Sequence, residues 1–329
     1  MQHYELLEAR FGEWMGEPYT VACSSGTAAL HLALEAMQLP LGSEVLLPEF
    51  TMVACARAIT LAGLVPVPVD CGDDLLLDPA LLSEHITTKT AAVMPVHIYG
   101  RRCDMQRITA FAARNRLAVV EDWAELCGFV PGEPNKSEAR CFSFYANKVI
   151  NSQEGGIICF REPRHASLSR CLRCQGFTEQ HDFYHVPRGI NARMPNCCAA
   201  LAIDSLARVD TNLARRRSIE RIYDSRIPTE YHQPPRLAPW VYDLRVRGLR
   251  AAAQDELIRT LNRQGIAARH AFKPISQLAE YLGAFTQLRA HRLSQEVVYL
   301  PLDPAISDDR AVEIADTFVA TLEQARKAP

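Results

Sequence analysis

The sequence predicts an α/β protein with a mostly parallel sheet. In the first half of the chain, short apolar strand signals alternate with segments of helical periodicity, and such repeated units form parallel sheets with helices on both faces. Hydrophobic residues make up 48% of the 329 residues, which is enough for a sizeable core. Beyond residue 160 the pattern changes to longer helical stretches and a smaller unit. We therefore expect a large domain over residues 1–215 and a smaller C-terminal α/β domain over residues 216–329.

Short apolar runs predict five strands in the first half of the chain. They lie at residues 19–23, 44–48, 65–70, 91–96 and 117–122. Two further apolar runs lie on either side of Lys148, within residues 141–160. Ligands of parallel sheets bind beyond the carboxyl ends of the strands, so the residues that follow each strand are the candidates for chemistry.

Segments between these strands have helical spacing. They lie at residues 26–38, 51–63, 78–86 and 104–116. The third is predicted to begin with Asp78 as a cap and Pro79 at the first helical position. Later in the chain, residues 162–174, 196–226, 253–264 and a segment from about Ser307 are predicted to be helical, and residues 240–248 to be extended.

Charge and cysteine content limit the classes of function. The chain has 36 Lys and Arg against 38 Asp and Glu, a net charge of -2, which gives no electrostatic footprint for nucleic acid or an acidic membrane. No apolar run is long enough to span a bilayer. The 11 cysteines are odd in number and scattered, unlike a disulfide framework, so we expect a reducing cytoplasm.

Three positions after strands carry candidate chemistry. Gly26 and Thr27 begin a helix, where backbone N–H groups and a hydroxyl suit a phosphate, although an ordinary capped helix has the same residues. Asp122 ends a strand, where a carboxylate can hold a ribose hydroxyl, a metal or a protonated ring nitrogen. Lys148 is placed where burial would lower its pKa and make it a nucleophile toward carbonyls; a lysine turned outward from a loop is the alternative.

Together these three features are the parts of a pyridoxal phosphate (PLP) site. The phosphate anchors the cofactor, the Asp keeps the pyridine nitrogen protonated, and the lysine forms a Schiff base. The sequence has no Gly-x-Gly-x-x-Gly fingerprint and no P-loop, which argues against a dinucleotide or nucleoside triphosphate site.

Ordered motifs across nearly the whole chain resemble the DegT/DnrJ/StrS family of PLP-dependent sugar aminotransferases. The matching segments are SSGTAALHLAL, GSEVLLPEFTMVACARAI, PVHIYGRRCDM, VVEDWAELCG, CFSFYANKVINSQEGGIICF, GINARMPN and YLPLDPAISDD. The Tyr-x-Asn-Lys and Glu-Leu-Cys-Gly details, with RCLRCQGF, are most similar to the perosamine synthase branch. The resemblance implies fold type I of the PLP-dependent transferases, the aspartate aminotransferase-like fold, with PLP as cofactor.

The resemblance also implies roles for individual residues. Lys148 would form the Schiff base and move the proton between the cofactor and substrate carbons, and Asp122 would pair with the pyridine nitrogen. The other implied cofactor contacts are Gly26, Thr27 and Ser143 at the phosphate, Met52 over the ring, Glu125 near the ring hydroxyl, and Asn191, which would reach the phosphate from the partner subunit of a homodimer. The implied substrate-side residues are His97, His185 and Ser276. For His97, a structural hydrogen bond to its own loop is the alternative.

The chain departs from the family pattern at several points. Met52 replaces an aromatic residue, Ser276 replaces a His, and the usual N-terminal arm is missing, so we expect an effect on substrate choice. The spacing of Cys171, Cys174, His181 and His185 is similar to that of a zinc site. The gap between the two pairs is short, however, and nothing else supports zinc, so we expect no metal.

The activity implied by the resemblance is transfer of an amino group, from L-glutamate, to a nucleotide-linked keto-deoxysugar. One alternative is an aminotransferase that acts on a carbonyl outside the nucleotide sugars. A second is a sugar dehydratase on the same scaffold, in which His replaces the lysine, so Lys148 argues against it. A third is a non-enzymatic relative, which the presence of both Asp122 and Lys148 makes a poor match.

Overall fold

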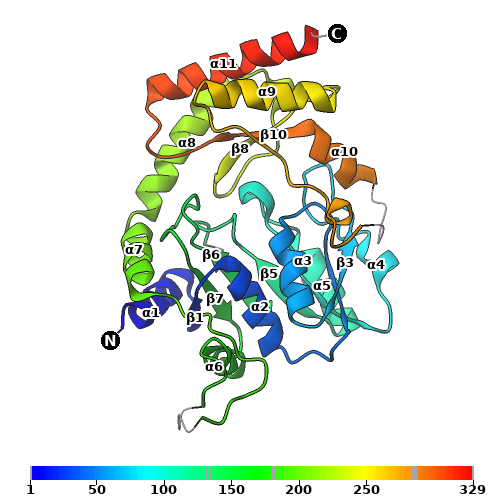
Figure 1. Ribbon diagram of the computed structural model, residues 1–329, viewed down its shortest axis with the longest axis vertical. Helices are drawn as coiled ribbons and strands as arrows, with labels where there is room; N and C mark the ends of the chain where they lie inside the picture. The colour runs from blue at the N-terminus through cyan, green and yellow to red at the C-terminus, as the bar shows by residue number, and fades with distance from the viewer. Residues whose placement is uncertain (1, 131, 133–134, 179–182, 283–287, 328–329) are drawn as a thin grey trace.

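The computed structural model, which describes residues 2–130, 132, 135–178, 183–282 and 288–327, has two sheets in this part of the chain (Figure 1). The larger has seven strands in the order β1-β7-β6-β5-β4-β2-β3. The strands are β1 (Tyr19–Cys23), β2 (Glu44–Pro48), β3 (Val65–Val69), β4 (Thr90–Val93), β5 (Ala118–Asp122), β6 (Ala139–Ser143) and β7 (Gly156–Phe160). Only β7 is antiparallel to its neighbours, β1 and β6, among the pairs in this sheet. The mostly parallel sheet predicted from the sequence is confirmed.

Helices cover this sheet. They are α1 (His3–Met15), α2 (Gly26–Ala36), α3 (Val53–Leu61), α4 (Leu82–His85), α5 (Met105–Asn115), α6 (Pro163–Leu172) and α7 (Asn196–Ala207). In Figure 1, α2 crosses in front of the sheet, and it packs against β6 and β7. Every residue of β6 and β7 is buried, so both faces of the sheet are covered at its centre, as parallel sheets require.

A smaller sheet lies toward the C-terminus. Its strands β8 (Val241–Arg245), β10 (Val297–Pro301) and β9 (Arg269–His270) are antiparallel, in that order. The helices of this part are α8 (Val209–Arg226), α9 (Ala251–Arg263), α10 (Leu288–Glu296) and α11 (Asp308–Lys327). An apolar cluster separate from the main core joins α8 from Ile219 onward, α9, α11, β8 and β10. The buried residues of α10, Ala290 and Leu293, pack in the main core instead. The domain boundary that we propose at residues 215/216 lies within α8.

Two predicted helices differ from the structure. Only residues 82–85 of the segment 78–86 are helical. Asp78 accepts the N–H of Ala80 at 3.0 Å, so it closes a turn in place of capping a helix. The segment predicted as one stretch at 196–226 divides at Arg208 into α7 and α8.

The backbone of Gly100 approaches the segment that precedes β8 very closely. Tyr99 (φ 52°) and Gly100 (φ 80°), in the 3₁₀ turn η1 (Ile98–Gly100), have left-handed backbones. A Cβ on Gly100 would lie 1.9 Å from the carbonyl oxygen of Ala238, so only glycine fits there. The Gly100 carbonyl accepts the N–H of Leu237 at 2.8 Å, which fixes the chain just before Trp240.

No helix in the described residues is both long and apolar enough to cross a membrane.

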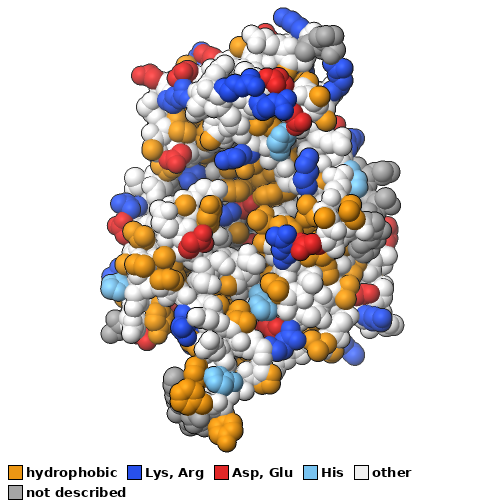
Figure 2. Space-filling view, in the orientation of Figure 1, with side chains coloured by type: hydrophobic (Ala, Val, Ile, Leu, Met, Phe, Trp, Pro, Cys, Tyr) orange, Lys and Arg blue, Asp and Glu red, His pale blue; other side chains and the backbone are white. Residues whose placement is uncertain are grey.

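The remaining short elements are the 3₁₀ turns η2 (Thr229–Tyr231) and η3 (Ile275–Gln277). Figure 2 shows a hollow on this face of the molecule, between the seven-stranded sheet and the C-terminal elements, in which hydrophobic side chains gather.

Candidate active site

A cavity of about 380 Å³ lies at the carboxyl ends of β1, β5 and β6. Its lining residues are Ser25, Gly26, Thr27, Leu30, Thr51, Met52, Ala54, Val96, Asp122, Ala124, Glu125, Ser143, Tyr145, Asn147, Lys148, Glu154, Trp240, Phe272 and Tyr299. The cavity therefore brings together the predicted phosphate residues, the predicted ring carboxylate and the predicted lysine. Ligands of parallel sheets bind at this end of the sheet, beyond the carboxyl ends of the strands.

The start of α2 and the end of β6 form one side of the cavity. Ser25 caps α2, because its hydroxyl accepts the N–H of Ala28 at 3.1 Å. A Cβ on Gly26 would lie 2.7 Å from the Cβ of Ser143, so a glycine is needed for this close approach. The N–H groups of a first helical turn have no partner within the helix, so with the Thr27 and Ser143 hydroxyls they form a cradle for an anion.

Lys148 follows β6 and reaches into the cavity from a tight turn, in which its N–H donates to the Tyr145 carbonyl at 2.8 Å. The residue is only 9% exposed. Its Nζ lies 3.9 Å from Glu125 Oε1. Burial lowers the pKa of Lys148, and the negative charges of Glu125 and Asp122 oppose that shift. The amine is thus more readily deprotonated than that of a surface lysine, as a nucleophile requires.

Asp122 ends β5 with both carboxylate oxygens engaged. Oδ1 accepts the N–H of Ala124 at 2.8 Å, and Oδ2 lies 3.1 Å from the Sγ of Cys55, which donates to it. Asp122 is 6% exposed and lines the cavity. The carboxylate therefore has a fixed orientation.

Glu125 lies one turn beyond Asp122. Its Oε2 accepts the N–H of Tyr99 at 2.8 Å. Burial raises the pKa of Glu125 to about 7, although the charge of Lys148 and the hydrogen bond from Tyr99 act in the opposite direction. Glu125 and Lys148 are therefore a neighbouring acid and base, both with pKa values shifted toward neutrality.

Met52 lines the cavity and is 47% exposed. Its sulfur accepts the N–H of Ala54 at 3.1 Å, so the side chain also caps the start of α3. A thioether at this position covers part of the cavity without the flat face of an aromatic ring.

The residues of the cavity fit PLP. The start of α2, where only a glycine fits at position 26, suits the phosphate. The fixed carboxylate of Asp122 suits a protonated ring nitrogen, and the buried amine of Lys148 suits the aldehyde. Each group of the cofactor thus has a partner of matching chemistry.

The three predicted substrate-side residues do not line the cavity. His97 is fully buried: its Nε2 bonds Glu121 Oε2 at 2.9 Å, and its Nδ1 accepts the N–H of Cys103 at 3.1 Å. The second of these is the loop hydrogen bond that was the alternative for His97. The position of its ring therefore argues for a structural role and against substrate contact.

His185 and Ser276 also lie elsewhere. His185 is exposed, and its Nδ1 lies 2.9 Å from the Gln175 carbonyl. Ser276 is buried, and its hydroxyl bonds Glu49 and the Nε2 of His291, the latter at 2.9 Å. These contacts argue against direct substrate binding by either side chain within one subunit.

Asn191 is exposed and pairs with Cys174 in an isolated β-bridge, outside the cavity of its own chain. His181, the fourth residue of the zinc-like spacing, lies outside the described residues. No group of three or more His, Cys, Asp and Glu residues among the described residues is arranged to hold a metal ion.

The cavity also contains residues that the sequence did not indicate. Trp240, Phe272 and Tyr299, from the C-terminal elements, also line the cavity. The Trp240 ring lies against Lys148, and Tyr299 lies near Glu125. Trp240 begins a segment that we predicted to be extended, but an aromatic residue at such a place is typical of any core. Its contact with Lys148 depends on how the two sheets pack, which no local signal encodes.

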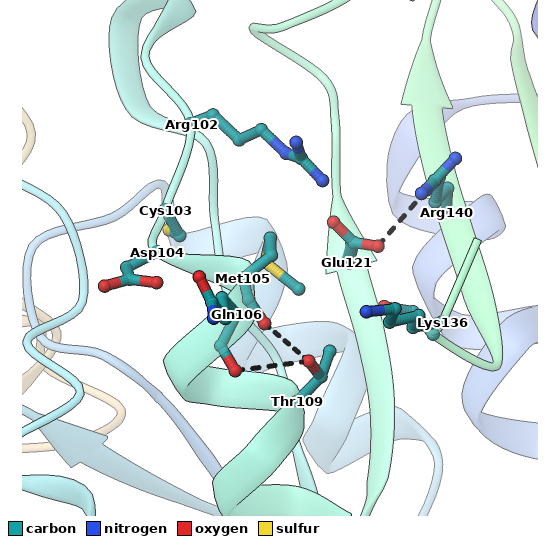
Figure 3. A pocket seen from close by; sticks show the side chains of 10 residues that line it. Arg102, Cys103, Asp104, Met105, Gln106, Thr109, Glu121, Lys136 and Arg140 are labelled. Atoms are coloured by element: carbon teal, nitrogen blue, oxygen red, sulfur yellow. Dashed lines mark hydrogen bonds and ion pairs between the residues drawn. The ribbon is translucent and has the colours of Figure 1, made fainter. Parts of the chain in front are cut away.

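A second cavity, of about 360 Å³, lies on the other face of β5. Because side chains alternate along a strand, Glu121 and Asp122 point to opposite faces. Figure 3 shows Glu121 with Arg102, Arg140 and Lys136 around it. Burial alone would raise the pKa of Glu121, but the hydrogen bond from His97 and the charge of Arg140 lower it to about 2. Glu121 is therefore a structural anion that holds β5 to its neighbours.

A family model described as the DegT/DnrJ/EryC1/StrS aminotransferase family matches residues 2–319 of the chain. Two proteins called GDP-perosamine synthase are similar in sequence. The one from Caulobacter vibrioides is 36% identical over 287 residues, which cover 84% of this chain and 77% of that protein. The one from Escherichia coli O157:H7 is 30% identical over 331 residues, which cover 96% of this chain and 89% of that protein.

Solved structures of Spr1654 from Streptococcus pneumoniae, a proposed sugar aminotransferase, have the same fold. The PMP form matches with a TM-score of 0.92 and 26% identity over 99% of this chain and 91% of that chain. The PLP form matches with a TM-score of 0.91 and 26% identity over 99% of this chain and 92% of that chain. The predicted fold class is thereby confirmed.

Proposed function

Because the chain belongs to the DegT/DnrJ/EryC1/StrS aminotransferase family, we propose that it transfers an amino group to the keto carbon of a nucleotide-linked deoxysugar. The chain is a PLP-dependent aminotransferase of fold type I. The names of its relatives, two GDP-perosamine synthases and a proposed sugar aminotransferase, support a nucleotide sugar as acceptor. The observation that carries the proposal is that Lys148, Asp122 and the phosphate cradle line one cavity.

Each cofactor contact has a proposed residue. Gly26, Thr27 and Ser143 hold the phosphate with N–H and hydroxyl groups. Asp122 pairs with the ring nitrogen, supported by the fixed orientation of its carboxylate. The remaining contacts to the ring come from Met52 over its face and from Glu125 near its hydroxyl.

Lys148 moves the proton. When bound, the cofactor supplies an electron sink for the carbon that loses or gains a proton. In the first half of the reaction Lys148 Nζ would move a proton from the α-carbon of the donor to the cofactor carbon, and in the second half from the cofactor carbon to the sugar carbon. Since burial lowers its pKa, the neutral amine is available for the first step, and Glu125 at 3.9 Å is placed to exchange a proton with it.

The amino donor and the assembly are the finer parts of the proposal. We take L-glutamate as the donor, on the strength of the family resemblance. The active unit is a homodimer in which Asn191 reaches the phosphate of the partner subunit, supported by its exposed position outside the cavity of its own chain. The scattered cysteines support a reducing cytoplasm as the location.

A two-stage assay tests the function. First, the PLP-loaded protein is mixed with single amino acids, and the cofactor absorbance reports which one gives up its amino group. Second, a panel of GDP-, dTDP- and UDP-linked ketosugars is offered with that donor, and mass spectrometry detects the aminated product. We expect 2-oxoglutarate from glutamate and an aminosugar from one class of nucleotide, and neither product from Lys148→Ala.

Two results of this assay would contradict the proposal. Amination of simple keto acids, with no nucleotide ketosugar accepted, would favour the non-sugar alternative. Loss of water from the sugar without uptake of nitrogen would favour the dehydratase alternative.

A further inference from the structure

The carboxylate of Asp122 is held by a buried thiol. Cys55 lies in the first turn of α3, is fully buried, and places its Sγ 3.1 Å from Asp122 Oδ2. The other oxygen, Oδ1, accepts the N–H of Ala124 at 2.8 Å. The two contacts come from different elements, so the carboxylate is held from two sides.

The direction of the hydrogen bonds follows from the charges. Burial, and then the negative charge of Asp122, raise the pKa of the Cys55 thiol well above its ordinary value, so the sulfur keeps its proton and donates it. The hydroxyl of Thr51, which is 1% exposed, lies 3.3 Å from the same sulfur. Because the only thiol proton is directed at Asp122, the Thr51 hydroxyl donates to the sulfur.

We propose that Cys55 is a positioning residue for the cofactor carboxylate: its S–H···Oδ2 bond, backed by Thr51, holds Asp122 in the orientation that faces the ring nitrogen of the cofactor. The proposal rests on the proposed role of Asp122. Thr51 lies in the loop just before α3 and Cys55 in the first turn of that helix, so the entry to α3 supplies both members of this chain of hydrogen bonds.

A thiol has properties that suit this task. It is a weak donor, so it orients the carboxylate while drawing little charge from it. A carboxylate that keeps its charge density remains a strong acceptor for a protonated ring nitrogen. The alternative is that Cys55 is only a small apolar filler, as buried cysteines commonly are.

Infrared spectroscopy tests the hydrogen bond without reference to activity. The S–H stretching band of Cys55 is isolated as the difference between the wild-type protein and Cys55→Ala. The same subtraction is made between Asp122→Asn and the double variant Asp122→Asn/Cys55→Ala. The band should then lie at higher frequency, because a neutral amide accepts the S–H bond more weakly than a carboxylate does. A band at the same frequency in both backgrounds would show that the thiol does not donate to Asp122 and would overturn the proposal.

Cofactor affinity tests the consequence. Cys55→Ala should raise the dissociation constant for PLP about fivefold, the factor that a hydrogen bond of ~1 kcal/mol gives. Cys55→Ser, which keeps a donor, should restore most of the affinity. The matched control is Cys159→Ala, because Cys159 is an equally buried thiol in β7. Equal affinities of the Cys55→Ala and Cys159→Ala proteins, measured at equal stability to urea, would show that Cys55 acts only as filler.

These outcomes are separable from a failure of the proposed function. If the wild-type protein bound PLP but aminated no sugar, the affinity series would still decide the role of Cys55. If the wild-type protein bound no PLP, the proposed function and the cofactor-facing role of Asp122 would both fail, while the infrared result would still decide whether the thiol donates.

Discussion

The Nζ of Lys148 lies 3.8 Å from the centroid of the Trp240 ring. The two residues come from different parts of the fold, since Lys148 follows β6 and Trp240 directly precedes β8. The indole N–H of Trp240 donates to the Asn147 carbonyl at 3.0 Å, which fixes the ring beside the lysine. A cation over a ring face is stabilised, so Trp240 favours the charged amine while burial favours the neutral one.

Replacing Trp240 should therefore lower the pKa of Lys148 further. Loss of an attraction of ~1–2 kcal/mol corresponds to roughly one pH unit. In Trp240→Leu, the midpoint of the pH dependence of covalent PLP attachment to the apoprotein should shift downward by about that amount. Trp240→Phe, which keeps a ring but loses the bond to Asn147, is the control and should shift less. Equal midpoints in all three proteins would contradict this role of the ring.

Glu125 should make the stability of the apoprotein depend on pH. Its pKa is raised from 4.5 to about 7 in the folded protein, so its contribution is fully present below pH 4.5 and is lost as the pH rises through 7. Glu125→Gln removes this loss, and its amide oxygen still accepts the N–H of Tyr99. Relative to wild type, the free energy of unfolding of the variant should therefore rise by roughly 3 kcal/mol between pH 4.5 and 8.

Urea unfolding at a series of pH values measures this difference. The expected result is a gap between variant and wild type that opens between pH 4.5 and 7. A gap that stays constant across this range would contradict the raised pKa.

Asp122→Asn should lower turnover by several orders of magnitude. Losing a charged hydrogen bond of ~1.5–3 kcal/mol already costs about ten- to hundredfold, before any effect on the electronics of the cofactor ring. The measurement is kcat of the PLP-loaded variant. Glu121→Gln is the matched control: it removes the neighbouring carboxylate on the opposite face and should cost stability without a comparable loss of turnover per folded molecule. A near-normal kcat in Asp122→Asn would refute its assigned role.

Mixed dimers test the proposed role of Asn191. Asn191→Asp places a carboxylate against the partner subunit's bound phosphate and should inactivate the enzyme by like-charge repulsion. In a hybrid with Lys148→Ala, one site carries both defects and the other carries none. Random pairing makes about half of the dimers hybrids, so the mixture should recover at most roughly a quarter of wild-type activity. Doubly tagged, purified hybrids that stay as inactive as both parents would show that Asn191 does not act across the interface.

Local signals in the sequence predicted the strands and the residues at their carboxyl ends well. Apolar runs marked the strands. Asp122 ends β5, and Gly26 and Lys148 lie a few residues after β1 and β6, so the rule that ligands bind at the carboxyl ends of strands placed all three together. The helix predicted at 78–86 was wrong in its first residues, because an Asp that can cap a helix can also close a turn, as Asp78 does here.

Contacts between distant segments were not predictable in this way. Cys55 and Asp122 are 67 residues apart, and a cysteine in an apolar helix has the same pattern whether it donates to a carboxylate or fills space. For His97 the motif left open a substrate-side role or a loop hydrogen bond, and the structure engages both ring nitrogens in bonds to Glu121 and Cys103. Side-chain partners across a sheet depend on packing, which periodicity does not encode.

The attachment point of the cofactor tests the central claim most directly. The PLP-loaded protein is treated with borohydride, which fixes the cofactor to its lysine, and the modified peptide is identified by mass spectrometry. The account predicts modification of Lys148 alone, with Lys148→Ala still binding PLP reversibly through the phosphate cradle. Modification of another lysine, such as Lys136 or Lys273, would contradict it.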